Sequence, residues 1–404
     1  MSIEHPAERL HALDAVRGGA LLLGVAFHAT LSFLPGPQIW VVRDVQSAEL
    51  GTFFFVAHIF RMTLFFVIAG FFARMLLERR GLGGFVRNRA KRILTPLLVF
   101  WPIVLTAIIA CFVWGAAAMN GGTLPTDGPP PPPLTVATFP LTHLWFLYVL
   151  LWLYAGALAL RGLVTLVDRG GGLRERLVDP AMRLLTATPL AAMVLAVPVA
   201  AVLILHPVWF PWGGVPTPDT GLLPNMAALV SFGTAFGFGW LLERQRGLLG
   251  AIERWWPIQL VLAVLLTIAC LVQLGTASAF TPIEGSAKTL MAISYALAVW
   301  TWTLGLLGLA LRFLTKERPA VRYVADASYW IYLLHLPVVM ALQVIVFGLA
   351  LPAVAKWAIV TGGAFLILIA SYHLLVRHSW IGRWLNGRKN PWRKPTVEME
   401  AQTA

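Results

Sequence analysis

The stretch LDAVRGGALLLGVAFHATLSF, residues 13–33, is long and apolar enough to cross a membrane, yet it contains an arginine and a histidine. Arg17 and His28 are eleven residues apart, so on a helix both side chains lie on one face, roughly 16 Å apart along the axis. Ionisable side chains inside a bilayer cost roughly 2.5 to 3.5 kcal/mol each on insertion scales. Either residue alone would be typical of a snorkelling arginine or a hydrogen-bonded core histidine. The pair on one face favours a functional site.

The composition of the whole chain is that of a polytopic membrane protein. Of its 404 residues, 58% are hydrophobic and 12% are charged, whereas about 25% of the residues in a typical soluble domain are charged. Apolar segments long enough to span a hydrocarbon core of about 30 Å lie at 13–34, 51–75, 93–117, 142–166, 187–206, 222–243, 256–275, 288–312, 325–348 and 352–376. We therefore expect an all-α bundle of about ten transmembrane helices, with residues 1–376 as a single membrane domain and residues 377–404 as a basic cytoplasmic tail.

The positive charge of the chain is explained by membrane topology. The formal net charge is +13, but all but five of the 31 Lys and Arg residues lie at the chain ends or near connections on one side of the expected bundle. The five exceptions are Arg17 and Arg61 within segments, and Arg43, Lys288 and Lys356 in or beside the opposite loops. By the positive-inside rule, this asymmetry predicts that both termini are cytoplasmic. The charge therefore indicates no nucleic-acid partner.

Further histidines and one more arginine lie inside the apolar segments. His58 and Arg61 are three residues apart and share a helix face. Because His28 lies at a similar depth, we expect these three side chains to meet in one cavity in the outer leaflet. His143 begins the fourth segment and His335 lies near the middle of the ninth; the alternatives for them are an interfacial histidine and a packed core histidine. No histidine pair has a metal-ligand spacing such as HxxxH, so we expect no metal site.

The sequence lacks residues and motifs that several other functions require. No Asp or Glu lies in the middle of any of the ten segments, whereas proton- or sodium-driven carriers usually need an intramembrane carboxylate. There is also no Walker lysine loop and no GxSxG motif, which disfavours an ATPase or a serine hydrolase. A neutral histidine facing an outer cavity, by contrast, suits general-base activation of a hydroxyl group.

Two outer loops have unusual compositions. The loop HPVWFPWGGVPTPDTG, residues 206–221, contains Trp209, Phe210 and Trp212. Such aromatic residues are typical of the interfacial belt of a membrane protein; the alternative is stacking on sugar rings. The loop at 118–141 contains the run Pro129–Pro133, which predicts an extended polyproline stretch outside the membrane.

Five motifs together resemble a known family of membrane enzymes. They are, in order, LHALDAVRGGALLLGVAFH, HIFRMTLFFVIAGFFARMLL, FVRNRAKRILTPLL, THLWFLYVLLW and ASYWIYLLHLP. Their order and spacing, over about residues 10–375, are similar to those of the integral-membrane acyltransferase family 3, and most like its periplasmic glucan succinyltransferase branch. The family's signature of an arginine, ten residues and a histidine falls on Arg17 and His28, and its RxxR motif falls on Arg89 and Arg92.

The resemblance implies a reaction that crosses the bacterial inner membrane. An acyl group would pass from cytoplasmic acyl-coenzyme A to a carbohydrate hydroxyl on the periplasmic side. Arg17 and His28 would be catalytic, and Arg89 with Arg92 would bind acyl-coenzyme A, since guanidinium groups suit phosphates. From their positions in the segments, and not from the resemblance, we expect His58, Arg61, His143 and His335 to form an acyl or acceptor pocket. The thioester supplies the free energy, so we expect no bound cofactor, metal or ATP.

The identity of the acyl group stays open between succinyl and acetyl. A succinyl group carries a carboxylate that must be matched by a cation inside the membrane, and Arg61 favours succinyl-coenzyme A for this reason. An acetyl group needs only a small apolar slot. The nearer alternative is thus an O-acetyltransferase that acts on lipopolysaccharide, exopolysaccharide or another acceptor. The more distant alternative is an exporter or flippase that passes a glycan or lipid along the aromatic outer loops.

Overall fold

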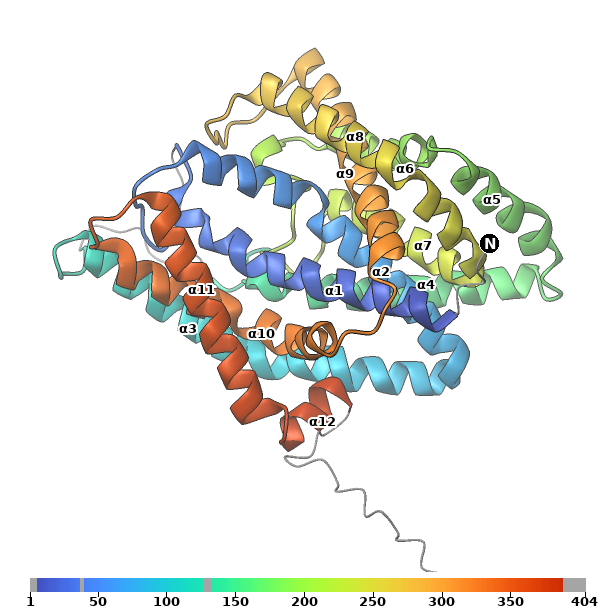
Figure 1. Cartoon of the computed structure of the whole chain (residues 1–404), viewed down its shortest axis with the longest axis horizontal. Coiled ribbons are helices and arrows are strands. Elements are labelled where there is room, and N and C mark those ends of the chain that lie inside the picture. The colour runs from blue at the N-terminus through green and yellow to red at the C-terminus, as the bar shows by residue number, and fades with distance from the viewer. Residues whose placement is uncertain (1–5, 37–39, 126–132, 388–404) are drawn as a thin grey trace, which may run out of the picture.

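The computed structural model describes residues 6–36, 40–125 and 133–387 (Figure 1). Most of the expected proline run, residues 129–132, and the chain beyond residue 387 lie outside this part. Within it the secondary structure is helical, apart from one isolated bridge between Pro140 and Thr220. The α-helices are α1 (Pro6–Ala29), α2 (Ala48–Arg89), α3 (Thr95–Met119), α4 (Trp145–Val167), α5 (Asp179–Ala187), α6 (Ala191–Leu205), α7 (Met226–Arg244), α8 (Leu249–Leu274), α9 (Gly285–Phe313), α10 (Pro319–Phe347), α11 (Ala353–Ser371) and α12 (Trp380–Asn386).

The expectation of an all-α, multi-pass membrane protein is confirmed. Eight helical stretches of the described residues are long and apolar enough to cross a membrane, or nine if a pair bent by 106° around residues 187–191 forms one span. The expected number was about ten. One of the eight stretches, Ala48–Met119, contains 72 residues and covers two of the expected segments. Gly81 interrupts it with a φ of 66°, a backbone conformation that glycine adopts without strain, so that α3 runs back towards the other end of the bundle (Figure 1).

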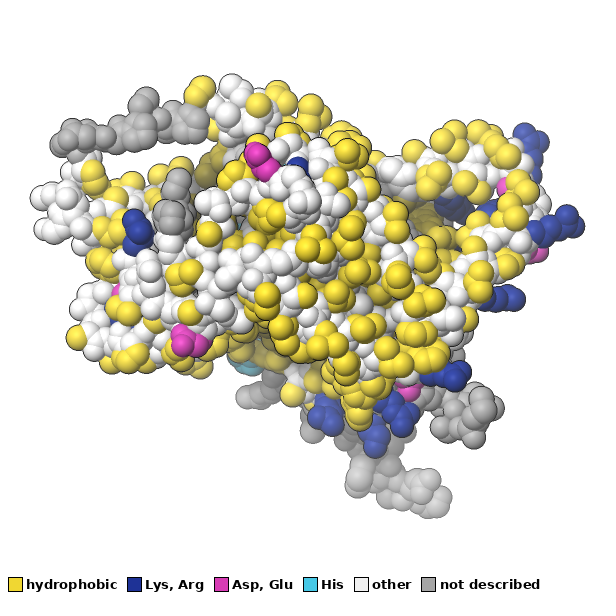
Figure 2. Space-filling view, turned by 90° about the horizontal axis from the view of Figure 1, so that it is seen from above, with side chains coloured by type: hydrophobic (Ala, Val, Ile, Leu, Met, Phe, Trp, Pro, Cys, Tyr) yellow, Lys and Arg dark blue, Asp and Glu magenta, His cyan; other side chains and the backbone are white. Residues whose placement is uncertain are grey.

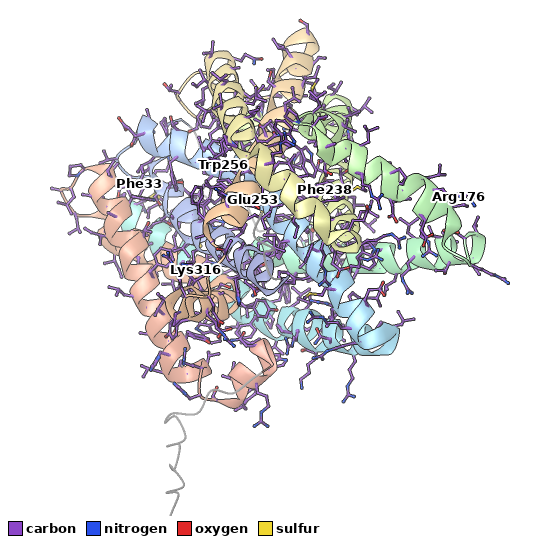
Figure 3. The ribbon with its side chains drawn as sticks, turned by 45° about the vertical axis from the view of Figure 1, so that its right-hand side comes forward. Phe33, Arg176, Phe238, Glu253, Trp256 and Lys316 are labelled. Carbon is purple, nitrogen blue, oxygen red and sulfur yellow. The ribbon has the colours of Figure 1, made fainter. Side chains whose placement is uncertain are left out.

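The structure separates the connecting segments into two groups. The start of α1, the α2–α3 junction, the start of α10 and α12 surround one cavity, to which Arg17, Arg92, Asp326 and Asn386 contribute. Basic side chains gather at the right and lower right of Figure 2. Figure 3 places Arg176, from the α4–α5 connection, on the side opposite Phe33, which follows α1. This separation agrees with the charge asymmetry of the sequence; that the basic end is cytoplasmic stays a prediction.

The opposite end of the bundle is held together by its loops. Lys356 in α11 forms an ion pair with Asp44, at 2.7 Å between Nζ and Oδ1, and both side chains are buried. Lys288 Nζ donates a hydrogen bond to the carbonyl of His206, and the Ser278 hydroxyl donates one to the carbonyl of Pro35. The Lys288 contact ties the start of the loop at 206–221 to α9, and the other two contacts join neighbouring segments at the same end.

Close contact between α2 and α7 fixes the position of α2. A Cβ atom on Gly70 would lie 2.0 Å from the carbonyl oxygen of Phe236, and one on Gly239 would lie 1.8 Å from that of Val67. Only glycine allows such backbone proximity. Because α2 also carries His58 and Arg61, this contact holds two of the predicted site residues in place.

The described part of the expected tail contains a short packed helix. In α12, the Trp384 ring stacks on Phe100 with 6.1 Å between ring centroids, and its indole N–H donates to the carbonyl of Lys91 at 3.0 Å. Asn386 Nδ2 donates to the carbonyl of Asp326 at 2.9 Å. The chain therefore contacts the basic end of the bundle at least as far as residue 386.

Candidate functional site

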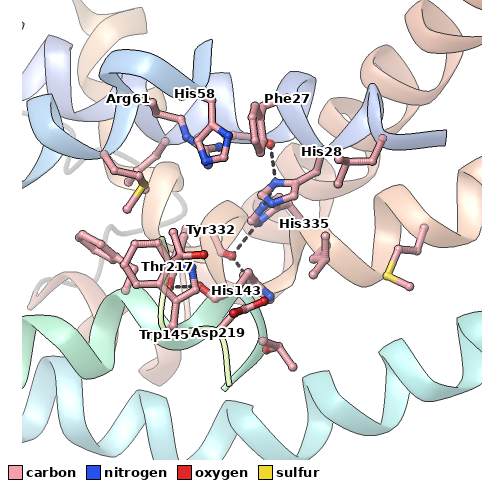
Figure 4. Close-up of a pocket in the computed structure, with 18 of the residues that line it drawn as sticks. Phe27, His28, His58, Arg61, His143, Trp145, Thr217, Asp219, Tyr332 and His335 are labelled. Atoms are coloured by element: carbon pink, nitrogen blue, oxygen red, sulfur yellow. Dashed lines mark hydrogen bonds between the residues drawn. The ribbon is translucent and has the colours of Figure 1, made fainter. Parts of the chain in front are cut away.

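A cavity of about 400 Å³ lies between α1, α2, α4 and α10, and the loop at 206–221 contributes Thr217 and Asp219 to its lining (Figure 4). All the predicted pocket residues line it, together with the predicted catalytic histidine: His28, His58, Arg61, His143 and His335. The structure therefore brings together side chains that the sequence spreads over more than 300 residues. We call this space the histidine cavity.

His28 and His335 are joined by a hydrogen bond that fixes the proton on each ring. His335 Nδ1 lies 2.7 Å from the carbonyl oxygen of Tyr332, and because a carbonyl only accepts, this nitrogen carries the proton. His335 Nε2 is then an acceptor when the ring is neutral, and it lies 3.1 Å from His28 Nδ1. His28 Nδ1 also lies 2.7 Å from the carbonyl of Gly24, so it donates. In the neutral state His28 Nε2 is therefore unprotonated and available as a base.

A proline in α10 explains the position of His143. Pro337 has no N–H, so the carbonyl of Leu333 lacks its helical partner. His143 Nε2 lies 3.3 Å from that carbonyl oxygen and 3.1 Å from the carbonyl oxygen of Tyr332. His143 thus hydrogen-bonds the backbone one turn before Pro337 and is 8% exposed. Its other ring nitrogen, Nδ1, has no hydrogen-bond partner.

Arg61 is a buried cation without a carboxylate partner. Arg61 is 9% exposed, and its guanidinium carbon lies 4.1 Å from the centroid of the Phe27 ring. Its Nε has no hydrogen-bond partner among the described residues. No ion pair to Arg61 is found in the part of the chain that the structure describes. A Cβ on Gly24 would lie 2.9 Å from Arg61 Nη1, so this glycine makes room for the guanidinium. An unpaired buried charge is costly, which points to an anionic ligand.

The aromatic outer loop folds inward, and the belt interpretation of its tryptophans is wrong. Trp209 and Trp212 are 1% and 0% exposed. The Trp209 N–H donates to the carbonyl of Gly214 at 2.7 Å, and the Trp212 ring packs on Phe55. Both rings are covered by protein, so the stacking alternative fails for them too. Their packing positions the rest of the loop over the histidine cavity.

A second cavity, of about 230 Å³, lies at the basic end of the bundle. Arg17, Arg89 and Arg92 all line it, and we call it the arginine cavity. Arg17 pairs with Asp14 at 3.0 Å, and the Arg89 guanidinium carbon lies 5.1 Å from the centroid of the Tyr154 ring. The predicted catalytic pair is thus divided: Arg17 lines this cavity and His28 lines the other.

The two cavities share one wall. Leu21, Phe65, Phe146 and Tyr332 line both of them. The Phe65 and Phe146 rings meet edge to face with 4.5 Å between centroids, and Phe146 meets Tyr332 in the same way at 5.8 Å. A single layer of side chains therefore separates the arginines from the histidines.

Three polar residues of the histidine cavity were not predicted from the sequence. They are Thr142, Thr217 and Asp219. The Asp219 side chain is accessible from the cavity. Neighbouring protein groups nevertheless remove part of its hydration, and this desolvation raises the pKa of its carboxyl group. Thr142 has a φ of 54°, which is unusual for a β-branched residue. A short loop with a single aspartate, such as TPDTG, gives no distinctive signal in the sequence. Among the described residues, no group of three or more His, Cys, Asp or Glu is arranged to hold a metal ion.

Comparison with known proteins identifies the family. The acyltransferase-domain model of acyltransferase family 3 matches residues 10–376, and the chain belongs to this family. Glucans biosynthesis protein C of Escherichia coli strain K12 is 35% identical over 149 residues, which cover 36% of this chain and 37% of that protein. The protein of the same name from strain O1:K1 / APEC is 34% identical over 148 residues, with the same coverage. The match thus spans little more than a third of these relatives' length. No solved structure matches the chain.

Proposed function

We propose that this chain is a membrane-bound O-acyltransferase of the bacterial inner membrane. It moves an acyl group from cytoplasmic acyl-coenzyme A to hydroxyl groups of a periplasmic or cell-surface glycan. The observation that carries the proposal is the pair of cavities, one lined by arginines and one by histidines, which share Leu21, Phe65, Phe146 and Tyr332 as lining residues. Membership of the acyltransferase family supports the reaction class, and the relatives named for glucan biosynthesis support the glycan acceptor.

The donor binds at the arginine cavity. Coenzyme A carries phosphate groups, for which arginine offers forked, charge-assisted hydrogen bonds. Arg17, Arg89 and Arg92 supply three guanidinium groups around this cavity. The pantetheine arm is narrow and flexible and extends through the shared wall, so that the thioester reaches the histidine cavity while the nucleotide stays at the basic end.

The acceptor hydroxyl is activated in the histidine cavity. His28 Nε2 takes the hydroxyl proton while the oxygen attacks the thioester carbonyl carbon, and the bond between carbon and sulfur breaks. The proton passes from His28 to the departing thiolate, which leaves as the free thiol of coenzyme A. His335 accepts a hydrogen bond from His28 Nδ1. His28 Nε2, the reactive nitrogen, is therefore directed away from His335.

The unpaired charge of Arg61 favours succinyl as the acyl group. A succinyl carboxylate in the histidine cavity would pair with this guanidinium and offset the cost of leaving water. Mass spectrometry of periplasmic and surface glycans from a deletion strain tests the assignment. We expect the loss of succinyl substituents from a periplasmic glucan. Loss of acetyl substituents would identify the chain as an O-acetyltransferase, and unchanged glycans would refute glycan acylation.

Loss of the RxxR arginines should weaken donor binding. Replacing both Arg89 and Arg92 with alanine should raise the apparent KM for acyl-coenzyme A by at least tenfold, since hydrogen bonds to charged groups contribute about 1.5 to 3 kcal/mol. The measurement is steady-state transfer by purified protein at varied donor concentration. The matched control is Arg79→Ala with Arg87→Ala, which removes the same charge from exposed positions outside the cavity. An equal change of this KM in both double variants would show that the RxxR arginines serve only as positive charges that set the membrane topology.

A further inference from the structure

The outer side of the histidine cavity has polar groups that the proposed chemistry does not use. Thr142 precedes α4, and Thr217 with Asp219 belongs to the loop at 206–221. All three line the cavity, and none lines the arginine cavity or the wall between the two. Figure 4 shows Asp219 beside His143, with Arg61 and His58 grouped across the cavity. These residues therefore lie where a molecule arriving from the outer loops would enter.

The backbone around Thr142 is strained and is held in place by the loop. The φ of 54° at Thr142 places a β-branched residue in the left-handed region. Its N–H donates to the carbonyl of Asp219 at 3.1 Å, and the N–H of Gly221 donates to the carbonyl of Phe139 at 2.9 Å. Pro140 and Thr220 form the isolated bridge between the same two segments. Such strain persists only where neighbouring structure enforces it, and it clusters at binding sites.

Thr142 and Asp219 keep hydrogen-bonding capacity for a ligand, although the backbone N–H groups of Asp219 and Thr220 already donate to the Asp219 carboxylate. The Thr142 hydroxyl is buried without a partner. Asp219 forms no ion pair with a described Lys or Arg. A carboxylate accepts two or more hydrogen bonds and a threonine hydroxyl both donates and accepts, which together suit a neutral polyol.

We propose that Thr142, Thr217 and Asp219 form a subsite that binds hydroxyl groups of the acceptor sugar. This inference rests on the proposed acyl transfer to a glycan. The two charged residues of the cavity favour different positions for the two substrates. Asp219 repels an anionic acyl group and accepts hydrogen bonds from sugar hydroxyls, whereas Arg61 attracts the acyl carboxylate. The subsite thereby holds the reacting hydroxyl near His28 while neighbouring hydroxyls are bound.

The test measures acceptor and donor binding separately in purified protein. The acceptor is the periplasmic oligosaccharide fraction from a strain that lacks this protein, and the donor is succinyl-coenzyme A. Asp219→Asn should raise the apparent KM for the acceptor about tenfold, and Thr217→Val about two- to tenfold, with the KM for the donor unchanged. Thr220→Val is the matched control, because this exposed threonine does not line the cavity.

The outcomes separate this inference from the proposed function. An acceptor KM within twofold of wild type in both variants, or a change equal to that of Thr220→Val, would overturn the subsite while leaving acyl transfer standing. A parallel rise in the donor KM would also overturn it, since the loop would then act on the whole cavity. Absence of transfer by the wild-type protein would refute the proposed function and the subsite together.

Discussion

Replacing His28 with alanine should lower acyl transfer by about 10²- to 10⁴-fold, the usual effect of removing a positioned base. The reason is the proton arrangement of the cavity. His28 Nδ1 donates to Gly24 and to His335, which leaves Nε2 as the unprotonated nitrogen, with no hydrogen bond to it found among the described residues. The measurement is release of free thiol from acyl-coenzyme A in the presence of glucan.

Expression and membrane insertion of the His28 variant should stay near wild type, because the ring lines a cavity and is not packed on all sides. His206→Ala is a suitable control, since this histidine lies in the outer loop and its ring bonds the carbonyl of Val208. Activity within a few-fold of wild type would show that His28 is a packing residue.

Replacing Arg61 with glutamine or leucine should change donor preference more than total activity. We expect use of succinyl-coenzyme A to fall about ten- to over a hundredfold relative to acetyl-coenzyme A, as the loss of a charge-assisted hydrogen bond predicts. Competition between the two labelled donors measures the ratio directly. Arg43→Gln provides the control, because Arg43 is exposed and does not line the histidine cavity. An equal loss with both donors would assign Arg61 to structure or acceptor binding.

The 3.6-residue repeat of the α-helix predicted which side chains of one helix share a face. The spacing of His58 and Arg61 predicted a shared face, and both line the histidine cavity with His28. The same period placed Arg17 and His28 on one face, but eleven residues also separate them along the axis by roughly 16 Å. That separation is why one lines the arginine cavity and the other the histidine cavity.

Loops and tertiary contacts account for what the sequence did not predict. Trp209 and Trp212 have the composition of an interfacial belt, and only the packing of their loop shows that both are buried. Thr142 and Asp219 are 77 residues apart and meet through a backbone hydrogen bond, which no local pattern encodes. Tyr332 lies three residues before His335, and nothing in the local sequence indicates that it forms part of the wall between the cavities.

The central claim is that an acyl group is transferred in the histidine cavity from acyl-coenzyme A whose nucleotide stays on the basic side. Inverted membrane vesicles that contain the protein and trapped periplasmic glucan test it most directly, because acyl-coenzyme A added outside then meets only the cytoplasmic face. The account predicts that label from the acyl group appears on the trapped glucan while free thiol accumulates outside. Transfer only when donor and glucan share one side of the membrane, or passage of glycan without consumption of acyl-coenzyme A, would contradict it.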